Sequence, residues 1–265
     1  MEYTNQTALI TGASSGIGEG FARELHSRGA NLVLVARRED RLKALCQELN
    51  ALRADSACYI VADVATDEVG RVLDRIKTSP IDILVSNAGR GSFGCFESLS
   101  LDAEVQMVEI NAIAPLRLMH AVIPQMKERR HGAIISVSSV ANFQPLPFMA
   151  TYAATKSFNF SHALGLRYEL APFGVRVLAV CPGPVATEFG GVARVPGTVT
   201  GGARDSVERV VAESLAALQK NKPYVVPCLR AKLLWLMVSC LPRGLTTWLT
   251  ERTLRSTLDH VTRSS

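Results

Sequence analysis

The 265-residue sequence lacks the patterns that mark several common classes of protein. No apolar run approaches the ~18 residues needed to cross a bilayer, so we expect no membrane-spanning helix. The first residues do not combine a basic and an apolar segment, so no secretory signal peptide is predicted. No C-x-x-C or H-E-x-x-H pattern occurs, so we predict reduced thiols and no metal site. These absences favour a cytoplasmic protein.

The net charge of +5 is concentrated near one end of the chain. Residues 220–265 contain eight Lys or Arg and two Asp or Glu, a net of +6, which leaves −1 for the rest. A balanced main body argues against a nucleic-acid partner. With 48% hydrophobic and 20% charged residues, the composition is that of a folded globular chain.

Seven short apolar runs rich in β-branched residues alternate with amphipathic stretches of helical period. This alternation predicts an α/β fold, in which βαβ units form a parallel sheet covered by helices on both faces. The expected strands are residues 8–10, 31–36, 57–61, 83–86, 133–137, 175–180 and 224–226.

Two segments depart from this alternation. Residues 188–205 contain five glycines and one proline, which predicts a long loop, either a surface excursion or a lid over a substrate. Residues 229–249 are too apolar for an ordinary tail. We therefore expect a main domain, residues 1–228 including this loop, followed by a helical extension, residues 229–265.

A glycine-rich sequence, Thr11-Gly12-Ala13-Ser14-Ser15-Gly16-Ile17-Gly18, joins the first expected strand to a helical stretch. Glycines allow a tight turn and let backbone N–H groups approach a pyrophosphate, and the helix N-terminus adds partial positive charge. An ordinary strand-to-helix turn is the alternative. The candidate residues for a dinucleotide phosphate are Gly12, Ser14, Ser15, Gly16, Ile17 and Gly18.

The second expected strand ends at Ala36 and is followed by Arg37 and Arg38. In dinucleotide-binding folds an acidic residue here favours a free ribose 2′-hydroxyl, whereas Arg accommodates a 2′-phosphate. An Arg at a helix N-terminus also opposes the helix dipole, which favours an anionic partner over a solvated helix start. We predict that Arg37 binds a 2′-phosphate, with Ser14 or Arg38 assisting.

Two further strand ends carry candidate cofactor residues. Asp63-Val64 follows the third expected strand, where Asp63 either accepts from an adenine amino group or serves as a turn residue. Asn87-Ala88-Gly89 ends the fourth, where small residues allow close backbone approach to a ligand; an ordinary turn is the alternative.

Tyr152 and Lys156 stand four residues apart, on one face of an expected helix. A free phenol has a pKa near 10, so work as a base near pH 7 requires a shift of about three units, or roughly 4 kcal/mol. A nearby ammonium and an oxidised nicotinamide both favour the phenolate. Ser139 lies thirteen residues before Tyr152, at the end of the fifth expected strand, and Asn111 lies in the helix before that strand. A solvated helix face is the alternative for the Tyr–Lys pair alone.

Together these motifs resemble the short-chain dehydrogenase/reductase family, of the single-domain type. The matching positions run from Thr11 to Thr187, and all four catalytic positions carry the family's residues. The resemblance implies a Rossmann-type, doubly wound parallel sheet of about seven strands and a nicotinamide cofactor. Ser86 replaces the first Asn of the family's Asn-Asn-Ala-Gly, which is a mild departure. A further match is Pro182-Gly183-Pro184-Val185-Ala186-Thr187, of which Pro182, Gly183, Val185 and Thr187 are candidate cofactor residues.

The resemblance also implies a role for each catalytic residue. Tyr152 donates a proton to a substrate carbonyl or removes one from an alcohol, and Ser139 hydrogen-bonds the same oxygen. Lys156 lowers the pKa of Tyr152 and binds the nicotinamide ribose, while Asn111 holds a water in a relay to Lys156. With the two arginines, this predicts an oxidoreductase that prefers NADP(H) to NAD(H) and acts on a small-molecule carbonyl or alcohol.

Alternative functions on the same fold are a cofactor-sensing regulator and an epimerase or dehydratase. The complete catalytic set argues against the regulator, and the short chain argues mildly against the other two. Residues 91–97, 142–148 and 188–205 are expected to line an apolar pocket. The phenylalanines that suggest its apolar character, unless they belong to the core, are Phe93, Phe96, Phe143, Phe148 and Phe189.

The segment 229–255 combines two apolar stripes with flanking bases around Pro242. It could cover the substrate pocket, enter a subunit interface or lie on an anionic membrane surface as a peripheral contact. By analogy with the family we also expect a homodimer or homotetramer, formed through residues 101–127 and 152–171.

Overall fold

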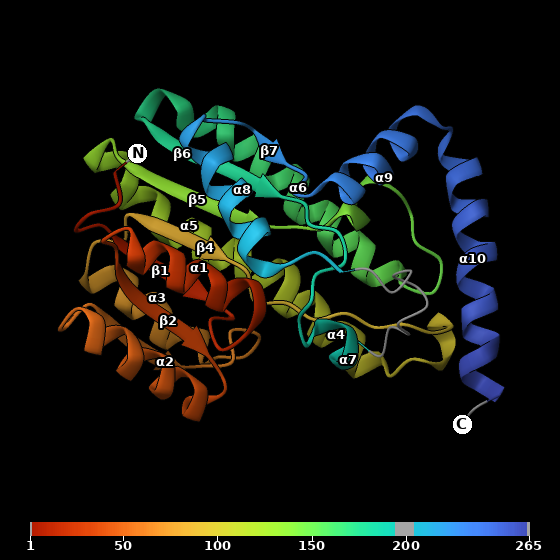
Figure 1. The fold of residues 1–265 in the computed structure, drawn as a ribbon, viewed down its shortest axis with the longest axis horizontal. Helices are drawn as coiled ribbons and strands as arrows, with labels where there is room; N and C mark the ends of the chain where they lie inside the picture. Colours follow the sequence, from red (N-terminus) through yellow and green to blue (C-terminus); the bar gives the residue numbers. More distant parts are fainter. Residues whose placement is uncertain (1, 194–203, 264–265) are drawn as a thin grey trace.

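The computed structural model describes residues 2–193 and 204–263, and its centre is a parallel sheet of seven strands (Figure 1). The strand order is β3-β2-β1-β4-β5-β6-β7. Every expected strand is confirmed to within one residue at either end. The strands are β1 (Thr7–Thr11), β2 (Asn31–Ala36), β3 (Ala57–Val61), β4 (Ile83–Ser86), β5 (Gly132–Val137), β6 (Val175–Val180) and β7 (Tyr224–Val225).

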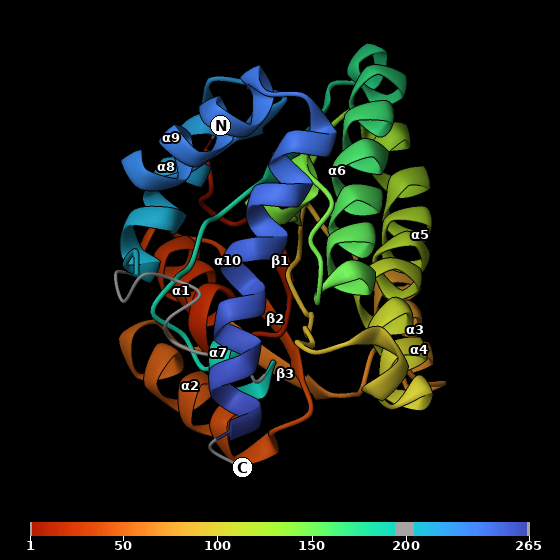
Figure 2. The same cartoon turned by 90° about the vertical axis from the view of Figure 1, so that its right-hand side faces the viewer.

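Helices cover both faces of the sheet, as the near-continuous apolar strands require (Figure 2). Neighbouring strand residues pack on opposite faces: Ile10 packs in the same cluster as Phe21, whereas Leu9 packs with Val122. One layer holds α1 (Gly16–Ser27), α2 (Glu39–Leu52) and α8 (Val207–Gln219). The other holds α3 (Val69–Thr78), α5 (Ala114–Arg129) and α6 (Ala150–Leu170), with α4 (Leu101–Val108) beside them.

Short helical turns connect several of these elements. The π-helical segment η2 (Glu109–Ile113) joins α4 to α5. The others are η1 (Phe96–Ser98), η3 (Val140–Phe143), η4 (Ala171–Phe173) and α7 (Phe189–Val192). Of the loop expected at residues 188–205, positions 194–203 lie outside the described residues.

The chain ends in two helices, α9 (Leu229–Cys240) and α10 (Arg243–Arg263), which turn at Pro242. α10 stands at the edge of the molecule, at the opposite end of the view from the N-terminus (Figure 1). The ring of Trp235 on α9 lies 6.3 Å from that of Phe143, centroid to centroid. Leu254 on α10 packs in one cluster with Met149 and Tyr152. No described helix is long and apolar enough to cross a bilayer.

The strand order reverses between β1 and β4, which are hydrogen-bonded neighbours. β2 and β3 extend the sheet on one side of this pair, and β5, β6 and β7 extend it on the other. The loops that follow β1 and β4 therefore diverge, which leaves a crevice at the carboxyl edge of the sheet. In open α/β sheets this is where ligands bind.

Candidate active site

A cavity of about 970 Å³ occupies this crevice and extends to the C-terminal helices. Two of the residues proposed from the sequence, Gly18 and Asn111, lie outside its lining. All the others line it: Gly12, Ser14, Ser15, Gly16, Ile17, Arg37, Arg38, Asp63, Val64, Asn87, Ala88, Gly89, Ser139, Tyr152, Lys156, Pro182, Gly183, Val185 and Thr187. The motifs therefore meet in one site.

The glycine-rich loop fits closely against the end of β4. Gly12 has φ +67°, and a Cβ there would lie 2.8 Å from Asn87 Nδ2 and 3.0 Å from Ala88 Cα. The backbone N–H groups of Asn87 and Ala88 both donate to Thr11 Oγ1, each over 3.0 Å. The Thr11 hydroxyl thus joins the two strand ends, and the missing side chain of Gly12 leaves a concave backbone surface of the kind that a dinucleotide phosphate occupies.

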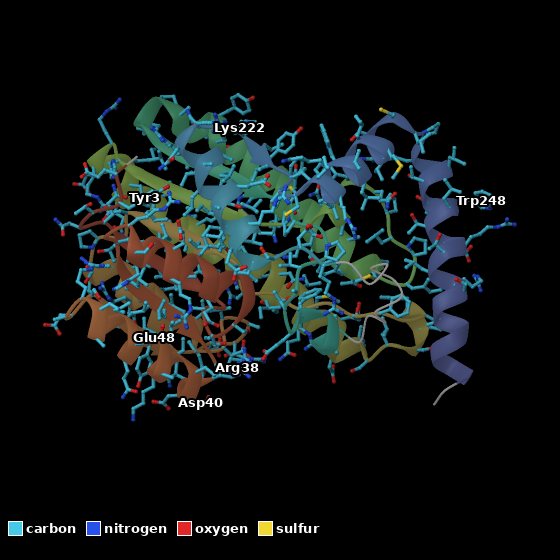
Figure 3. All side chains as sticks on the ribbon, viewed as in Figure 1. Tyr3, Arg38, Asp40, Glu48, Lys222 and Trp248 are labelled. Atoms are coloured by element: carbon cyan, nitrogen blue, oxygen red, sulfur yellow. The ribbon has the colours of Figure 1, made fainter. Side chains whose placement is uncertain are left out.

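The two arginines that follow β2 both line the cavity but differ in their contacts with the glycine-rich loop. Arg38, labelled in Figure 3, bonds Ser14 Oγ over 3.1 Å and Ser15 Oγ over 2.6 Å through Nη2. Arg37 is 65% exposed, and its Nη1 lies 3.4 Å from Asp63 Oδ2. Arg38 is therefore the arginine held against the glycine-rich loop, whereas Arg37 stands at the outer rim.

Asp63 has the geometry of a turn residue in addition to its place in the cavity lining. Its Oδ1 accepts from the backbone N–H of Ala65 over 3.0 Å, and its Oδ2 faces Arg37. The turn alternative considered from the sequence therefore describes part of its role.

Tyr152 is buried in the wall of the cavity, with 8% of its surface exposed. Burial raises the pKa of Tyr152 to about 12, and a hydrogen bond with the Ser139 side chain partly offsets that rise. Ser139 caps η3, where its Oγ accepts from the backbone N–H of Ala141 over 3.1 Å. The cap fixes the hydroxyl next to the phenol. Tyr152 is thus protonated near neutral pH, as a proton donor has to be before it reacts.

Lys156 lies one turn further along α6 and is also buried. Its Nζ donates to the carbonyl oxygen of Val137 over 3.0 Å and lies 5.8 Å from the Tyr152 ring centroid. Burial lowers the pKa of Lys156 to about 8. In the protein alone, burial is therefore the largest influence on the pKa of both side chains. The lowered pKa of Tyr152 that the family resemblance implies stays a prediction for the complex with the oxidised nicotinamide.

Asn111 is fully buried in the π-helical segment η2. Its Oδ1 accepts from the backbone N–H of Arg90 over 2.9 Å, and its Nδ2 donates to the Arg90 carbonyl over 2.9 Å and to Thr155 Oγ1 over 3.0 Å. The side chain therefore ties the loop after β4 to the helix that carries Tyr152. No motif in the sequence indicated that Thr155 and Arg90 would contact Asn111.

The far wall of the cavity is apolar and comes largely from the two C-terminal helices. It includes Leu234, Met237 and Val238 of α9 and Leu249 and Leu254 of α10. From the sequence, covering the pocket was only one of three roles considered for residues 229–255.

Only part of the phenylalanine set that we expected around the pocket lies there. Phe189 lines the cavity, and Phe93 and Phe148 belong to the cluster around Tyr152. The expectation is wrong for Phe143, which is packed in the core against Phe160 and Trp235. It is also wrong for Phe96, which is 63% exposed. Aromatic residues have the same sequence signature in a core as in a binding site.

The fold and the site define a Rossmann-type α/β protein with Tyr152, Lys156 and Ser139 in the same cavity as the glycine-rich loop. The chain belongs to the short-chain dehydrogenase family, whose family model, described as short chain dehydrogenase, matches residues 6–194. A short chain dehydrogenase of Pseudocercospora fijiensis is 37% identical over 194 residues, which are 71% of this chain and 62% of that protein. The chain spans about three-fifths of the length of such curated relatives.

Solved structures extend the similarity over nearly the whole chain. A short-chain dehydrogenase from Sphingobium yanoikuyae in complex with NADPH is 33% identical, with a TM-score of 0.82 over 91% of this chain and 95% of that one. A bulky-bulky ketone specific alcohol dehydrogenase from Comamonas testosteroni is 32% identical, with a TM-score of 0.78 over 91% and 93%. The chain therefore has the fold of oxidoreductases of this family.

Proposed function

We propose that the chain is an NADP(H)-dependent oxidoreductase that interconverts a bulky apolar ketone and its alcohol. The observation that carries the proposal is the meeting of Tyr152, Ser139 and Lys156 in one cavity, between a glycine-rich backbone cradle and an apolar wall. The residues fit the cofactor, because the loop leaves backbone room for a pyrophosphate and Arg38 stands beside Ser14 for a 2′-phosphate. Bound NADPH would supply the hydride.

The side chains supply the proton chemistry. Tyr152 gives its proton to the carbonyl oxygen, and Ser139 donates a hydrogen bond to the same oxygen as negative charge develops. Lys156 lies where it can bind the nicotinamide ribose. Its charge and that of the oxidised nicotinamide would favour the phenolate in the reverse reaction, against the effect of burial.

Asn111 has a positioning role in this proposal. Its side-chain oxygen and nitrogen already bond Arg90 and Thr155, so a relay water near Lys156 would bind the main-chain carbonyl of η2. A π-helical turn changes the regular backbone pairing and is frequent at functional sites.

The substrate class rests on the apolar wall from α9 and α10 and on the relative described as specific for bulky-bulky ketones. The test is NADPH oxidation, followed by absorbance, with diaryl ketones, small ketones and aldehydes. We expect turnover that is fastest with the bulky ketones. Binding of NADPH without turnover of any carbonyl would instead favour the cofactor-sensing regulator, and turnover of small aldehydes alone would refute the bulky substrate.

We propose a homodimer or homotetramer formed through α4, α5 and α6. Large apolar side chains are exposed on these helices: Leu101 is 70% exposed, Val105 54% and Phe158 38%. Sedimentation at micromolar concentration tests the assembly, and a monomer would refute it.

We propose that α9 and α10 close the substrate end of the cavity, because their inner sides line it. Their outer sides expose Leu233 and Leu236, and Trp248 lies on the outer side of α10 (Figure 3). Peripheral contact with an anionic membrane is the alternative role. Salt-sensitive co-sedimentation with anionic liposomes would support that contact. Its absence at low salt would leave a lid or a subunit interface as the role of α9 and α10.

A further inference from the structure

Glu188 lies between the arginines at the cofactor end of the cavity and the segment that contacts Tyr152. It lies between Thr187 and Phe189, both of which line the cavity, and it directly precedes α7. Its carboxylate accepts from Arg38 Nη1 and from Arg41 Nη1, each over 2.7 Å. Hydrogen bonds from Arg38 and then Arg41 lower the pKa of Glu188 to about 2, so the carboxylate is charged at every physiological pH.

The Glu188 carboxylate is paired with Arg38 and Arg41, the two guanidinium groups that a 2′-phosphate would need. Arg38 already reaches Ser14 and Ser15 with its other nitrogen, so a phosphate beside Ser14 would lie next to the Arg38 guanidinium. A phosphate group carries a charge of about −1.5 to −2 near pH 7 and has three acceptor oxygens. It is therefore a stronger partner for arginine than a carboxylate, and it repels a carboxylate held at the same place.

The segment that Glu188 anchors contacts the catalytic tyrosine. The ring of Phe189 lies 5.5 Å from that of Tyr152, centroid to centroid. α7 also packs on the loop after β4, where a Cβ on Gly91 would lie 2.9 Å from Phe189 Cζ. Release of the Glu188 anchor would therefore loosen the ring that covers Tyr152.

We propose that Glu188 competes with the 2′-phosphate of the cofactor for Arg38 and Arg41, so that phosphate binding releases α7 and opens the substrate side of Tyr152. This inference rests on the proposed NADP(H) preference. It assigns Arg41, which the sequence did not single out, as a third phosphate-binding cation. It also makes Glu188 a specificity-determining residue, because NADH has no phosphate with which to displace it.

The test measures nucleotide binding without catalysis. Titration calorimetry with 2′,5′-ADP, which carries the phosphate, and 5′-AMP, which does not, separates the phosphate contribution. Glu188→Gln should bind 2′,5′-ADP about three- to tenfold more tightly than the unmodified chain, because two exposed ion pairs no longer compete. Its affinity for 5′-AMP should not change. The matched control is Glu39→Gln, which removes the same charge from the start of α2, where Glu39 hydrogen-bonds Tyr59.

Hydrogen exchange of the α7 backbone gives a second readout. In the unmodified chain 2′,5′-ADP should speed exchange at residues 189–193, and in Glu188→Gln exchange should be fast without nucleotide. Arg41→Gln should also speed exchange, but it should weaken 2′,5′-ADP binding, because it removes a phosphate partner together with the anchor. Opposite effects on affinity with the same effect on exchange distinguish competition from a general loss of structure.

Three results would overturn the inference. Equal tightening in Glu188→Gln and Glu39→Gln would show only a long-range charge effect. Unchanged or weaker 2′,5′-ADP binding in Glu188→Gln, with 5′-AMP binding intact, would exclude competition while leaving the cofactor proposal standing. Equal affinity of the unmodified chain for 2′,5′-ADP and 5′-AMP would overturn the NADP(H) preference itself, and this inference with it.

Discussion

Replacing Gly18 with alanine should damage both the stability of the protein and its nucleotide site. A Cβ at Gly18 would lie 2.6 Å from Asn87 Nδ2 and closer still to the carbonyl oxygen of Gly12. A helical Gly→Ala change ordinarily stabilises by about 0.5–1 kcal/mol. Extra volume in packed space costs about 1–3 kcal/mol, and here the opposing atoms include backbone that cannot rotate away. We take the upper end of that cost, about 3 kcal/mol, and subtract the helical gain of about 1 kcal/mol, which gives an expected net loss of about 2 kcal/mol.

Thermal denaturation and nucleotide titration measure the two effects. A loss of that size should lower Tm by about 4–8 °C in a chain of this length. The displaced Gly12 carbonyl and Asn87 side chain should also weaken NADPH binding, by about tenfold if 1.4 kcal/mol of contact is lost. The control is Gly70→Ala in the first turn of α3, where no atom lies within 4 Å of the added Cβ, and it should be neutral or stabilising. Unchanged Tm and affinity in Gly18→Ala would refute the close fit of the loop.

Three other predictions follow from the cavity. Neutralising Arg37 or Arg38 should raise the KM for NADPH and leave kcat with NADH nearly unchanged, with the larger effect at Arg38, which contacts Ser14; equal efficiency of the unmodified protein with both cofactors would contradict the basis of this prediction. Because burial lowers the pKa of Lys156 from 10.5 to about 8, the unfolded chain binds more protons between these values, so Lys156 makes the cofactor-free fold more stable as pH rises. Between pH 7 and 9.5 the free energy of unfolding of the unmodified protein, measured with urea, should rise by about 2 kcal/mol relative to that of Lys156→Met. Parallel pH profiles of the two proteins would contradict the lowered pKa. Asn111→Ala should leave the partly buried backbone N–H and C=O of Arg90 without their side-chain partner, cost about 2 kcal/mol and lower kcat, whereas normal stability in denaturant would show that Asn111 does not hold the loop.

The strands could be predicted from the sequence because each is a short, β-branched apolar run between amphipathic helices. Their burial on both faces leaves few alternatives, and the order of motifs along the chain brings Gly12, Ser139 and Tyr152 to the same edge of the sheet. Hydrophobic patterning and the motifs at strand ends were therefore sufficient to predict most of the fold and most residues of the site.

Contacts between distant side chains could not be predicted in the same way. Arg37 and Arg38 are adjacent and chemically identical, and only the direction of each side chain decides which one meets Ser14. The contact of Glu188 with Arg38 joins positions 150 residues apart, and no local pattern encodes it. The π-helical turn around Asn111 likewise depends on its bonds to the loop after β4.

The most direct test of the proposed chemistry is the turnover of Tyr152→Phe. The change removes the phenolic hydroxyl and keeps the ring that packs against Phe189. Loss of a positioned general acid should lower kcat for NADPH-dependent ketone reduction by about 10²–10⁴-fold, while the Kd for NADPH stays the same. Retention of most of the rate, with cofactor binding intact, would show that Tyr152 is not the proton donor.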